Sequence, residues 1–165
     1  CANAYPMLEE MFAEYKDQVY TYTRDLIRSL KTDGYVLLAV SGSPHEAVAK
    51  LANYYGFDDF TAATFVQASG QFTGEMNTPF HGKAEPLKQL VTKHGLSFAG
   101  SIGVGDSGSD STMLELTEYP IAFNPNQQLF KHAREKGWRV VIERKNMIYE
   151  LEPHNGRYLL AQTNI

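Results

Sequence analysis

The stretch that decides the fold of this chain is Ser101-Ile102-Gly103-Val104-Gly105-Asp106-Ser107-Gly108-Ser109-Asp110. Its first four residues form a short apolar run that is typical of a strand buried on both faces. Two aspartates, Asp106 and Asp110, then follow with only small residues between them. Two carboxylates in a tight loop after a buried strand suit a Mg²⁺ site, because this ion takes few carboxylates and keeps several waters. The competing interpretations are a turn aspartate for Asp106 and a helix N-cap for Asp110.

Strand and helix patterns alternate on both sides of this loop, which indicates an α/β protein with a mostly parallel sheet. Buried strands are expected at 35–40, 101–104, 121–123 and 138–142, helices at 8–32, 44–55, 84–94, 111–117 and 126–136, and a hairpin at 61–76 turning at Ser69-Gly70. The tail from residue 146 onward has only a weak pattern. Because ligands bind beyond the carboxyl ends of the strands in such sheets, candidate site residues should directly follow strands.

The first of the expected helices is a single amphipathic one over residues 8–32. Its apolar residues recur at spacings of three and four from Leu8 to Leu30. Asp33-Gly34 should end it, because glycine accepts the left-handed backbone at a helix C-terminus. Several tyrosines in this region could line a pocket, although core packing is the usual role of an aromatic stripe.

The first candidate site is Ser41-Gly42-Ser43, between the strand at 35–40 and the next helix. We expect Ser43 to be the N-cap of that helix and Pro44 its first residue. The free N–H groups and the dipole of a helix start attract phosphate, and the Ser41 hydroxyl adds a donor. An ordinary capping turn is the competing interpretation, since strand–turn–helix connections commonly carry Ser and Gly.

The second candidate is Lys83 in His81-Gly82-Lys83, just before the helix at 84–94. A lysine there can neutralise the charge of a transferring phosphoryl group. A solvated lysine is the competing interpretation, because most lysines lie on the surface. A cation at a helix N-terminus opposes the helix dipole, however, and this favours a functional reason.

Composition excludes several classes of protein. The 165 residues carry 15 Lys and Arg against 19 Asp and Glu, a net charge of −4, so we expect no nucleic-acid partner and no membrane partner. The single cysteine rules out an internal disulfide framework and a cysteine-rich zinc site. No apolar run approaches the roughly 20 residues of a membrane span, and we expect a cytoplasmic protein.

Two other hydrolase classes and zinc sites are disfavoured. Gly105-Asp106-Ser107-Gly108 is similar to the serine loop of chymotrypsin-like proteases, but those are all-β barrels, whereas strands and helices alternate here. The G-x-S-x-G pattern of α/β-hydrolases occurs nowhere in the chain. The five histidines do not have the spacing of zinc ligands.

Taken together, these places resemble the motifs of the haloacid dehalogenase superfamily, in its phosphoserine-phosphatase-like branch. That family has a Ser or Thr closing a strand, a Lys before a helix and a G-D-x-x-x-D loop. The matching residues are Ser41, Lys83, and Asp106 with Asp110, and Ile121-Ala122-Phe123-Asn124-Pro125 and Ala133-Arg134-Glu135-Lys136-Gly137-Trp138 are also similar to this branch. The resemblance covers residues 35–142 and implies a Rossmann-type parallel sheet with flanking helices.

The family's first motif, D-x-D on the central strand, has no match, because no two of the seven aspartates are spaced in this way. In the family, the first aspartate of this motif is the nucleophile that becomes an aspartyl phosphate, and the second is the general acid/base. We therefore expect residues 33–165 to be a core without its first strand and residues 1–32 to be the remnant of a helical cap. The chain by itself should be inactive.

The resemblance implies a Mg²⁺-dependent phosphomonoester hydrolase that acts on a small phosphorylated metabolite. Ser41, Lys83 and Asp110 would be catalytic. Ser41, Gly42 and Lys83 would bind phosphate. Asp106 and Asp110 would hold Mg²⁺, and Asp110 would orient Lys83 or a metal-bound water.

The alternative function is a non-catalytic phosphate-binding or scaffold protein derived from the same fold. Loss of the central strand would expose two sheet edges and a hydrophobic slot, which argues against it. An incomplete sheet could pair with another chain, so a homo-oligomer is one expectation. The sequence begins at Cys1 rather than Met, so we expect something upstream to be missing or removed; a lipidated Cys1 is a further alternative.

Overall fold

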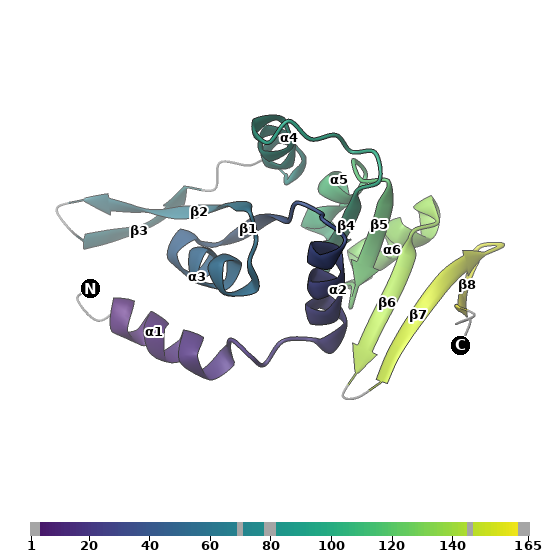
Figure 1. The fold of residues 1–165 in the computed structure, drawn as a ribbon, viewed down its shortest axis with the longest axis horizontal. Helices are drawn as coiled ribbons and strands as arrows, with labels where there is room; N and C mark the ends of the chain where they lie inside the picture. Colours follow the sequence, from purple (N-terminus) through teal and green to yellow (C-terminus); the bar gives the residue numbers. More distant parts are fainter. Residues whose placement is uncertain (1–3, 69–70, 78–81, 145–146, 162–165) are drawn as a thin grey trace. The chain divides into compact units, whose positions relative to one another are not determined.

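The computed structural model describes residues 4–68, 71–77, 82–144 and 147–161 (Figure 1). These residues belong to two compact units, Cys1–His81 and Gly82–Ile165, and each unit has its own sheet. Cys1 and the predicted turn at Ser69-Gly70 lie outside the described residues. Among the helices of the described ranges, none has both the length and the apolar character needed to cross a membrane.

The first unit combines three helices with a three-stranded sheet of order β1-β2-β3. Its elements are α1 (Ala4–Tyr15), α2 (Thr21–Thr32), β1 (Leu38–Pro44), α3 (His45–Tyr55), β2 (Asp59–Ala68) and β3 (Gln71–Asn77). β1 and β2 are parallel and connected by α3, whereas β2 and β3 form an antiparallel hairpin. The hairpin predicted at 61–76 is therefore confirmed, as is the end of the predicted helix 44–55, since α3 ends at Tyr55 and the next residue, Gly56, has a left-handed φ of 72°.

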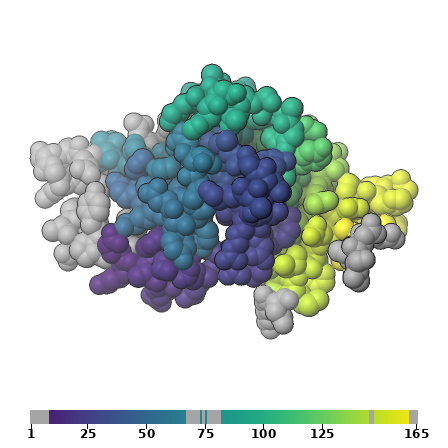
Figure 2. Space-filling view, viewed as in Figure 1, coloured from purple at the N-terminus to yellow at the C-terminus, as the bar shows by residue number. Residues whose placement is uncertain are grey.

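The single helix predicted over 8–32 is wrong, because the chain forms the two helices α1 and α2 there. The break begins at Lys16, whose carbonyl accepts a hydrogen bond from the Tyr55 hydroxyl of α3. This contact satisfies a backbone group in the segment between the two helices. Figure 2 shows α1 and α3 side by side. Phe12 of α1 lies against Tyr54 of α3, with 5.7 Å between the ring centroids. Packing between α1 and α3 therefore overrides the continuous apolar pattern.

The second unit contains a five-stranded sheet of order β4-β5-β6-β7-β8. Its elements are α4 (Ala84–Lys93), β4 (Ile102–Gly105), the 3₁₀ turn η1 (Gly108–Asp110), α5 (Ser111–Leu114), β5 (Tyr119–Phe123), α6 (Gln127–Lys136), β6 (Arg139–Arg144), β7 (Met147–His154) and β8 (Arg157–Leu160). β4, β5 and β6 are parallel, and β7 and β8 continue the sheet in antiparallel fashion. The predicted α/β class with a parallel sheet and flanking helices is confirmed, and the hairpin of β7 and β8 adds an antiparallel part to that sheet.

α5 and α6 pack on this sheet through a small apolar core. Leu114 of α5 and Leu129 and Ala133 of α6 are fully buried. They meet Ala122 of β5 and Val140 of β6, which are fully buried as well. Burial of each leucine contributes about 1.5–3 kcal/mol. This core holds Ala122 near the end of β5, the strand that pairs with β4, whose end begins the loop of the candidate site.

The tail that has a weak sequence pattern forms the hairpin of β7 and β8. β7 pairs with β6 from Val140 to Arg144, and β8 pairs with β7. Leu151 and Tyr158 pack against the core, and the Tyr158 hydroxyl donates to the carbonyl of Trp138 at 2.9 Å. Most other side chains of the hairpin are exposed, so its sequence lacks the apolar run of a buried strand.

Candidate active site

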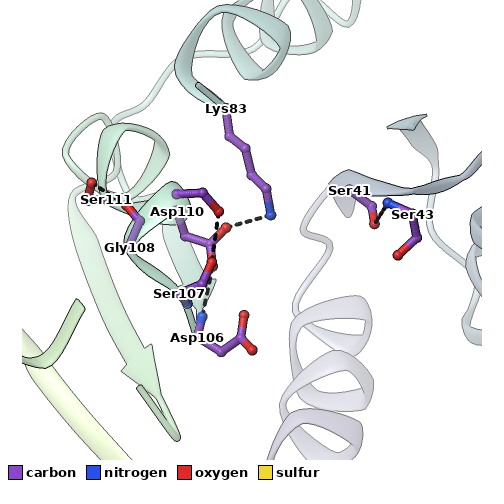
Figure 3. Close-up of polar contacts among 9 residues, drawn as sticks. Ser41, Ser43, Lys83, Asp106, Ser107, Gly108, Asp110 and Ser111 are labelled. Atoms are coloured by element: carbon purple, nitrogen blue, oxygen red, sulfur yellow. Dashed lines mark hydrogen bonds and ion pairs between the residues drawn. The ribbon is translucent and has the colours of Figure 1, made fainter. Parts of the chain in front are cut away.

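The candidate site lies in the loop that follows β4 (Figure 3). Asp106 begins this loop, and Asp110 ends the 3₁₀ turn within it. The side chain of Asp106 is exposed, whereas Asp110 is only 1% exposed. The two acids predicted as a pair therefore lie in very different environments.

The buried carboxylate of Asp110 organises the loop. Its Oδ2 accepts hydrogen bonds from the backbone N–H groups of Asp106 and Ser107, both at 2.9 Å. The Ser107 hydroxyl donates to the same oxygen at 3.1 Å and lies 2.8 Å from the Ser109 hydroxyl. Donors that converge on one oxygen favour the ionised carboxylate. Asp110 thus fixes the backbone on which Asp106 stands.

The other oxygen of Asp110 is paired with Lys83. Lys83 Nζ lies 2.5 Å from Asp110 Oδ1, and the side chains are 22% and 2% exposed. Within the described ranges, this oxygen has no hydrogen-bond partner besides the ion pair. Lys83 directly precedes α4, as predicted. The helix dipole disfavours a cation at the N-terminus of α4, and the pairing of Lys83 with a buried carboxylate explains why one is there.

The pKa values of the two carboxyl groups are shifted in opposite directions. Burial raises the pKa of Asp110, but the hydrogen bonds from Lys83 and Ser107 outweigh it and hold that pKa below its ordinary value. Partial burial and the negative charge of Asp110 raise the pKa of Asp106 above its ordinary value. Such divergence between neighbouring acids is typical of functional sites. A bound cation would therefore stabilise the charged form of Asp106 more than that of Asp110, which Lys83 already stabilises.

Two glycines make this geometry accessible. A Cβ on Gly105 would lie only 2.6 Å from the Cβ of Asp110, so the close approach of Asp110 to β4 requires glycine. Gly82 has a φ of +115°, which favours glycine, and a Cβ there would lie 3.3 Å from Thr112 Oγ1. Both glycines are part of the motifs found in the sequence. The sequence alone did not show that Asp110 lies against Gly105 or that Thr112 lies against Gly82.

The structure brings Lys83, Asp106 and Asp110 together within the second unit, whereas Ser41 and Gly42 belong to the first unit. Ser41 lies in β1, and the register between β1 and β2 shifts between Val40 and Pro44. The predicted turn is therefore an irregular part of a strand. The Ser41 Oγ accepts the N–H of Ser43 at 3.1 Å.

The N-cap predicted at Ser43 is wrong. The residue in the N-cap position of α3 is Pro44, and it makes no side-chain cap hydrogen bond. The residue before a proline is driven toward an extended conformation, so the strand continues to Pro44 and α3 begins at His45. Ser41 therefore stands farther from the helix start than its spacing suggested.

The donor set of the loop fits Mg²⁺. In the described part of the chain, no three His, Cys, Asp or Glu side chains gather at one point. Mg²⁺ does not require such a cage, because it is usually held by one or two carboxylates together with waters and substrate phosphate oxygens. The exposed carboxylate of Asp106 offers this kind of ligand. Both oxygens of Asp110 already have partners, which suits it to orienting its neighbours.

The comparison with known protein families agrees with this geometry. Residues 3–115 match the model of the haloacid dehalogenase-like hydrolase family. The chain belongs to this family. As a haloacid dehalogenase-like hydrolase, it is expected to carry its functional loops at the carboxyl ends of parallel strands, where Asp106 lies.

Curated relatives of this haloacid dehalogenase-like hydrolase include phosphatases. Phosphoserine phosphatase SerB1 of Mycobacterium tuberculosis is 29% identical over 136 residues, which are 80% of this chain and 44% of the relative. The phosphoserine phosphatase of Methanocaldococcus jannaschii is 29% identical over 102 residues, 60% of this chain and 48% of the relative. The chain thus spans about half the length of the curated relatives it matches.

Solved structures support the same branch of the family. A phosphoserine phosphatase solved as a phospho-aspartyl intermediate analogue has a TM-score of 0.63 and 26% identity, covering 74% of this chain and 57% of that one. A protein of unknown function from Bordetella pertussis Tohama I shares the fold, with a TM-score of 0.72 and 24% identity, covering 86% of this chain and 66% of that one. The predicted resemblance to the phosphoserine-phosphatase-like branch is confirmed.

Proposed function

We propose that this haloacid dehalogenase-like hydrolase works as a Mg²⁺-dependent phosphatase of small phosphorylated metabolites. The observation that carries the proposal is the ion pair of Lys83 with Asp110 beside the exposed Asp106. A fixed cation next to an exposed carboxylate suits a substrate that carries several negative charges. The names of the curated relatives, two of which are phosphoserine phosphatases, support phosphate esters as the substrate class.

Lys83 is the group proposed to neutralise the phosphate. Its long side chain would otherwise sample many rotamers, but the ion pair with Asp110 holds the ammonium group at one point. A preorganised charge stabilises the transition state more than a mobile one, because it needs no reorganisation during the reaction. Asp110 acts in this scheme as the positioning residue of Lys83.

Asp106 is the proposed ligand of Mg²⁺. Its carboxylate is exposed, and its backbone N–H is anchored on Asp110. The metal would supply Lewis-acid neutralisation of phosphoryl oxygens. Asp110 contributes indirectly, since its two oxygens are occupied by Lys83 and by the N–H groups of the loop. This refines the expectation that both aspartates are direct ligands.

Ser41 and Gly42 are the proposed phosphate donors. The Ser41 oxygen accepts the N–H of Ser43, so its hydroxyl proton is available for a phosphoryl oxygen. A Cβ on Gly42 would meet no described atom within 4 Å, which leaves room around its backbone for a ligand. Both residues lie in the segment where the pairing of β1 with β2 is irregular.

The nucleophilic carboxylate is the remaining requirement, since the sequence contains no D-x-D pair. In the described part of the chain, β4 pairs with β5 and is an edge strand of its sheet. A parallel strand added at this edge would bring its carboxyl end beside Asp106, because parallel strands end on the same side of the sheet. We propose that the attacking carboxylate is supplied on such a strand.

The test is phosphate release from an aryl phosphate by the protein expressed from its complete natural reading frame. Hydrolysis is expected with Mg²⁺ and not with EDTA, and Lys83→Met or Asp106→Asn should lower the rate by about a hundredfold or more. Asp25→Asn, which removes an exposed carboxylate of α2 that lies 3.5 Å from Arg28, is the matched control. Unchanged hydrolysis in Asp106→Asn contradicts the proposed metal role. Phosphate binding without hydrolysis under any divalent metal would favour the non-catalytic alternative.

A further inference from the structure

The turn between β5 and α6 is bonded to the backbone of the loop that carries Asp106. The backbone N–H of Asn126 donates to the carbonyl of Asp106 at 2.8 Å. Asn126 is also the N-cap of α6, and its side-chain oxygen accepts the N–H of Leu129 at 2.9 Å. The residue that starts α6 therefore holds Asp106 as well.

Asn124 fixes the position of this turn. Its φ of +43° lies in the left-handed region, which asparagine tolerates better than most residues. Its N–H donates to the carbonyl of Val141, and its Oδ1 accepts the N–H of Glu143, both at 2.8 Å. These two bonds tie the turn to β6 where the ladder between β5 and β6 ends.

The first turn of α6 also packs directly on the loop. A Cβ on Gly108 would lie 2.2 Å from the side chain of Gln128, so only glycine fits at this position against α6. The loop is thus held by Asp110 from within and by the start of α6 from outside. Asp106 is bonded at both of its backbone groups, through its N–H to Asp110 and through its carbonyl to Asn126.

We propose that Asn126 is a positioning residue for Asp106. Its backbone N–H, set in place by the left-handed turn at Asn124, fixes the peptide from which the Asp106 carboxylate projects and thereby sets the affinity of that carboxylate for a divalent cation. This inference rests on the proposed function only in that Asp106 is taken to hold the metal.

Two variants at one position isolate the hydrogen bond. Asn126→Pro removes the N–H, and the φ of −67° at this position is the value that proline prefers. Asn126→Ala keeps the N–H and removes only the side chain that caps α6. Both variants lack the cap, so they differ in the N–H that donates to the Asp106 carbonyl and in the proline ring, and an amide outside the loop serves as the control for the ring.

The first readout is amide hydrogen exchange in the full chain without metal. The amides of Asp106 and Ser107 are expected to exchange about fivefold faster in Asn126→Pro than in Asn126→Ala, the effect of losing one net hydrogen bond. The amide of Leu87, which is bonded to the Lys83 carbonyl in α4, should exchange equally in both variants. Equal exchange of Asp106 and Ser107 in the two variants overturns the inference.

The second readout is a titration with Mn²⁺, followed by the paramagnetic broadening of the Ser107 amide resonance. Half-broadening is expected to need about fivefold more Mn²⁺ in Asn126→Pro than in Asn126→Ala. Asp106→Asn defines the broadening that depends on the carboxylate. Carboxylate-dependent broadening that is equal in both variants overturns the inference and leaves the proposed function intact. No such broadening in the wild-type protein overturns the metal role of Asp106, while the exchange rates still decide how the loop is positioned.

Discussion

Lys83 and Asp110 form an ion pair of 2.5 Å that joins the start of α4 to the loop after β4. The pair does more than bring opposite charges together, because the second oxygen of Asp110 accepts the N–H groups of Asp106 and Ser107. One buried carboxylate thus sets the positions of a cation and of an exposed acid. Lys83 and Asp106 are therefore coupled through Asp110 within a single compact unit.

Replacing Lys83 with Met should destabilise the second unit. The change leaves Asp110 Oδ1 buried without a partner, which is expected to lower the free energy of unfolding by about 2–3 kcal/mol after allowance for the partial exposure of the lysine. Lys88→Met is the matched control, since Lys88 makes an exposed contact of 3.8 Å with Glu85, and this variant should change stability by less than about 0.5 kcal/mol. Urea denaturation measures both. Equal midpoints for the two variants would show that the buried pair contributes no stability.

Gly105→Ala should disturb the same loop from the side of β4. The new Cβ would overlap the Cβ of Asp110 at 2.6 Å. Asp110 must therefore move away from the backbone N–H groups of Asp106 and Ser107, which donate hydrogen bonds to it. We expect a loss of about 2–3 kcal/mol in the free energy of unfolding. Gly42→Ala is the stability control, because a Cβ there meets no described atom within 4 Å. Thermal unfolding of the two variants provides the measurement, and a Gly105→Ala protein as stable as Gly42→Ala contradicts the packing argument.

The parallel strands β4, β5 and β6 could be predicted from sequence because each is a short apolar run between polar turns. Val140 and Val141 of β6, both fully buried, show why such a run indicates a strand covered on two faces. The helix predicted over 8–32 failed for a tertiary reason. The apolar spacing continues through Lys16, but the Tyr55 hydroxyl of α3 bonds the Lys16 carbonyl where the helix stops. No local pattern reports a contact with another helix.

The site could be predicted by residue type and by place, but not by role. Spacing made Asp106 and Asp110 look like equivalent metal ligands, whereas the structure leaves one exposed and buries the other. The difference arises because the 3₁₀ turn directs Asp110 inward onto Lys83, a residue from a distant segment. The contact of Asn126 with Asp106 could not be predicted from the sequence, because it is made by the backbone N–H of Asn126, which every residue except proline has.

Leu151 and Leu160 provide a test of how the C-terminal hairpin is held. They are directly paired across β7 and β8, but Leu151 packs against the core and Leu160 is 65% exposed. Leu151→Ala is expected to lower the free energy of unfolding by about 2 kcal/mol, and Leu160→Ala by less than about 0.5 kcal/mol. Urea denaturation of both variants checks this difference. Similar losses in the two variants would mean that exposed contacts of the hairpin carry its stability.

Tyr158 should make the second unit sensitive to alkaline pH. Its hydroxyl donates to the carbonyl of Trp138 at 2.9 Å, and burial raises the pKa of Tyr158 above its ordinary value of 10.0. A raised pKa in the folded state means that the stabilisation is fully present below pH 10.0 and is lost as the pH rises through the folded-state pKa. The physical reason is that the ionised phenolate can no longer donate to Trp138 and is costly to bury.

The experiment compares Tyr158→Phe with the wild-type protein by urea denaturation at about pH 8 and about pH 11. At the lower pH, the variant should be less stable by about 1 kcal/mol, the net value of one hydrogen bond. At the higher pH this difference should shrink or reverse, because the wild-type protein loses the bond as well. Tyr149→Phe, on the more exposed strand position opposite Ile142, is the control for removing a tyrosine hydroxyl from β7, and at the lower pH it should change stability by less than Tyr158→Phe. A difference between Tyr158→Phe and wild type that stays constant over this range contradicts the role assigned to the Tyr158 hydroxyl.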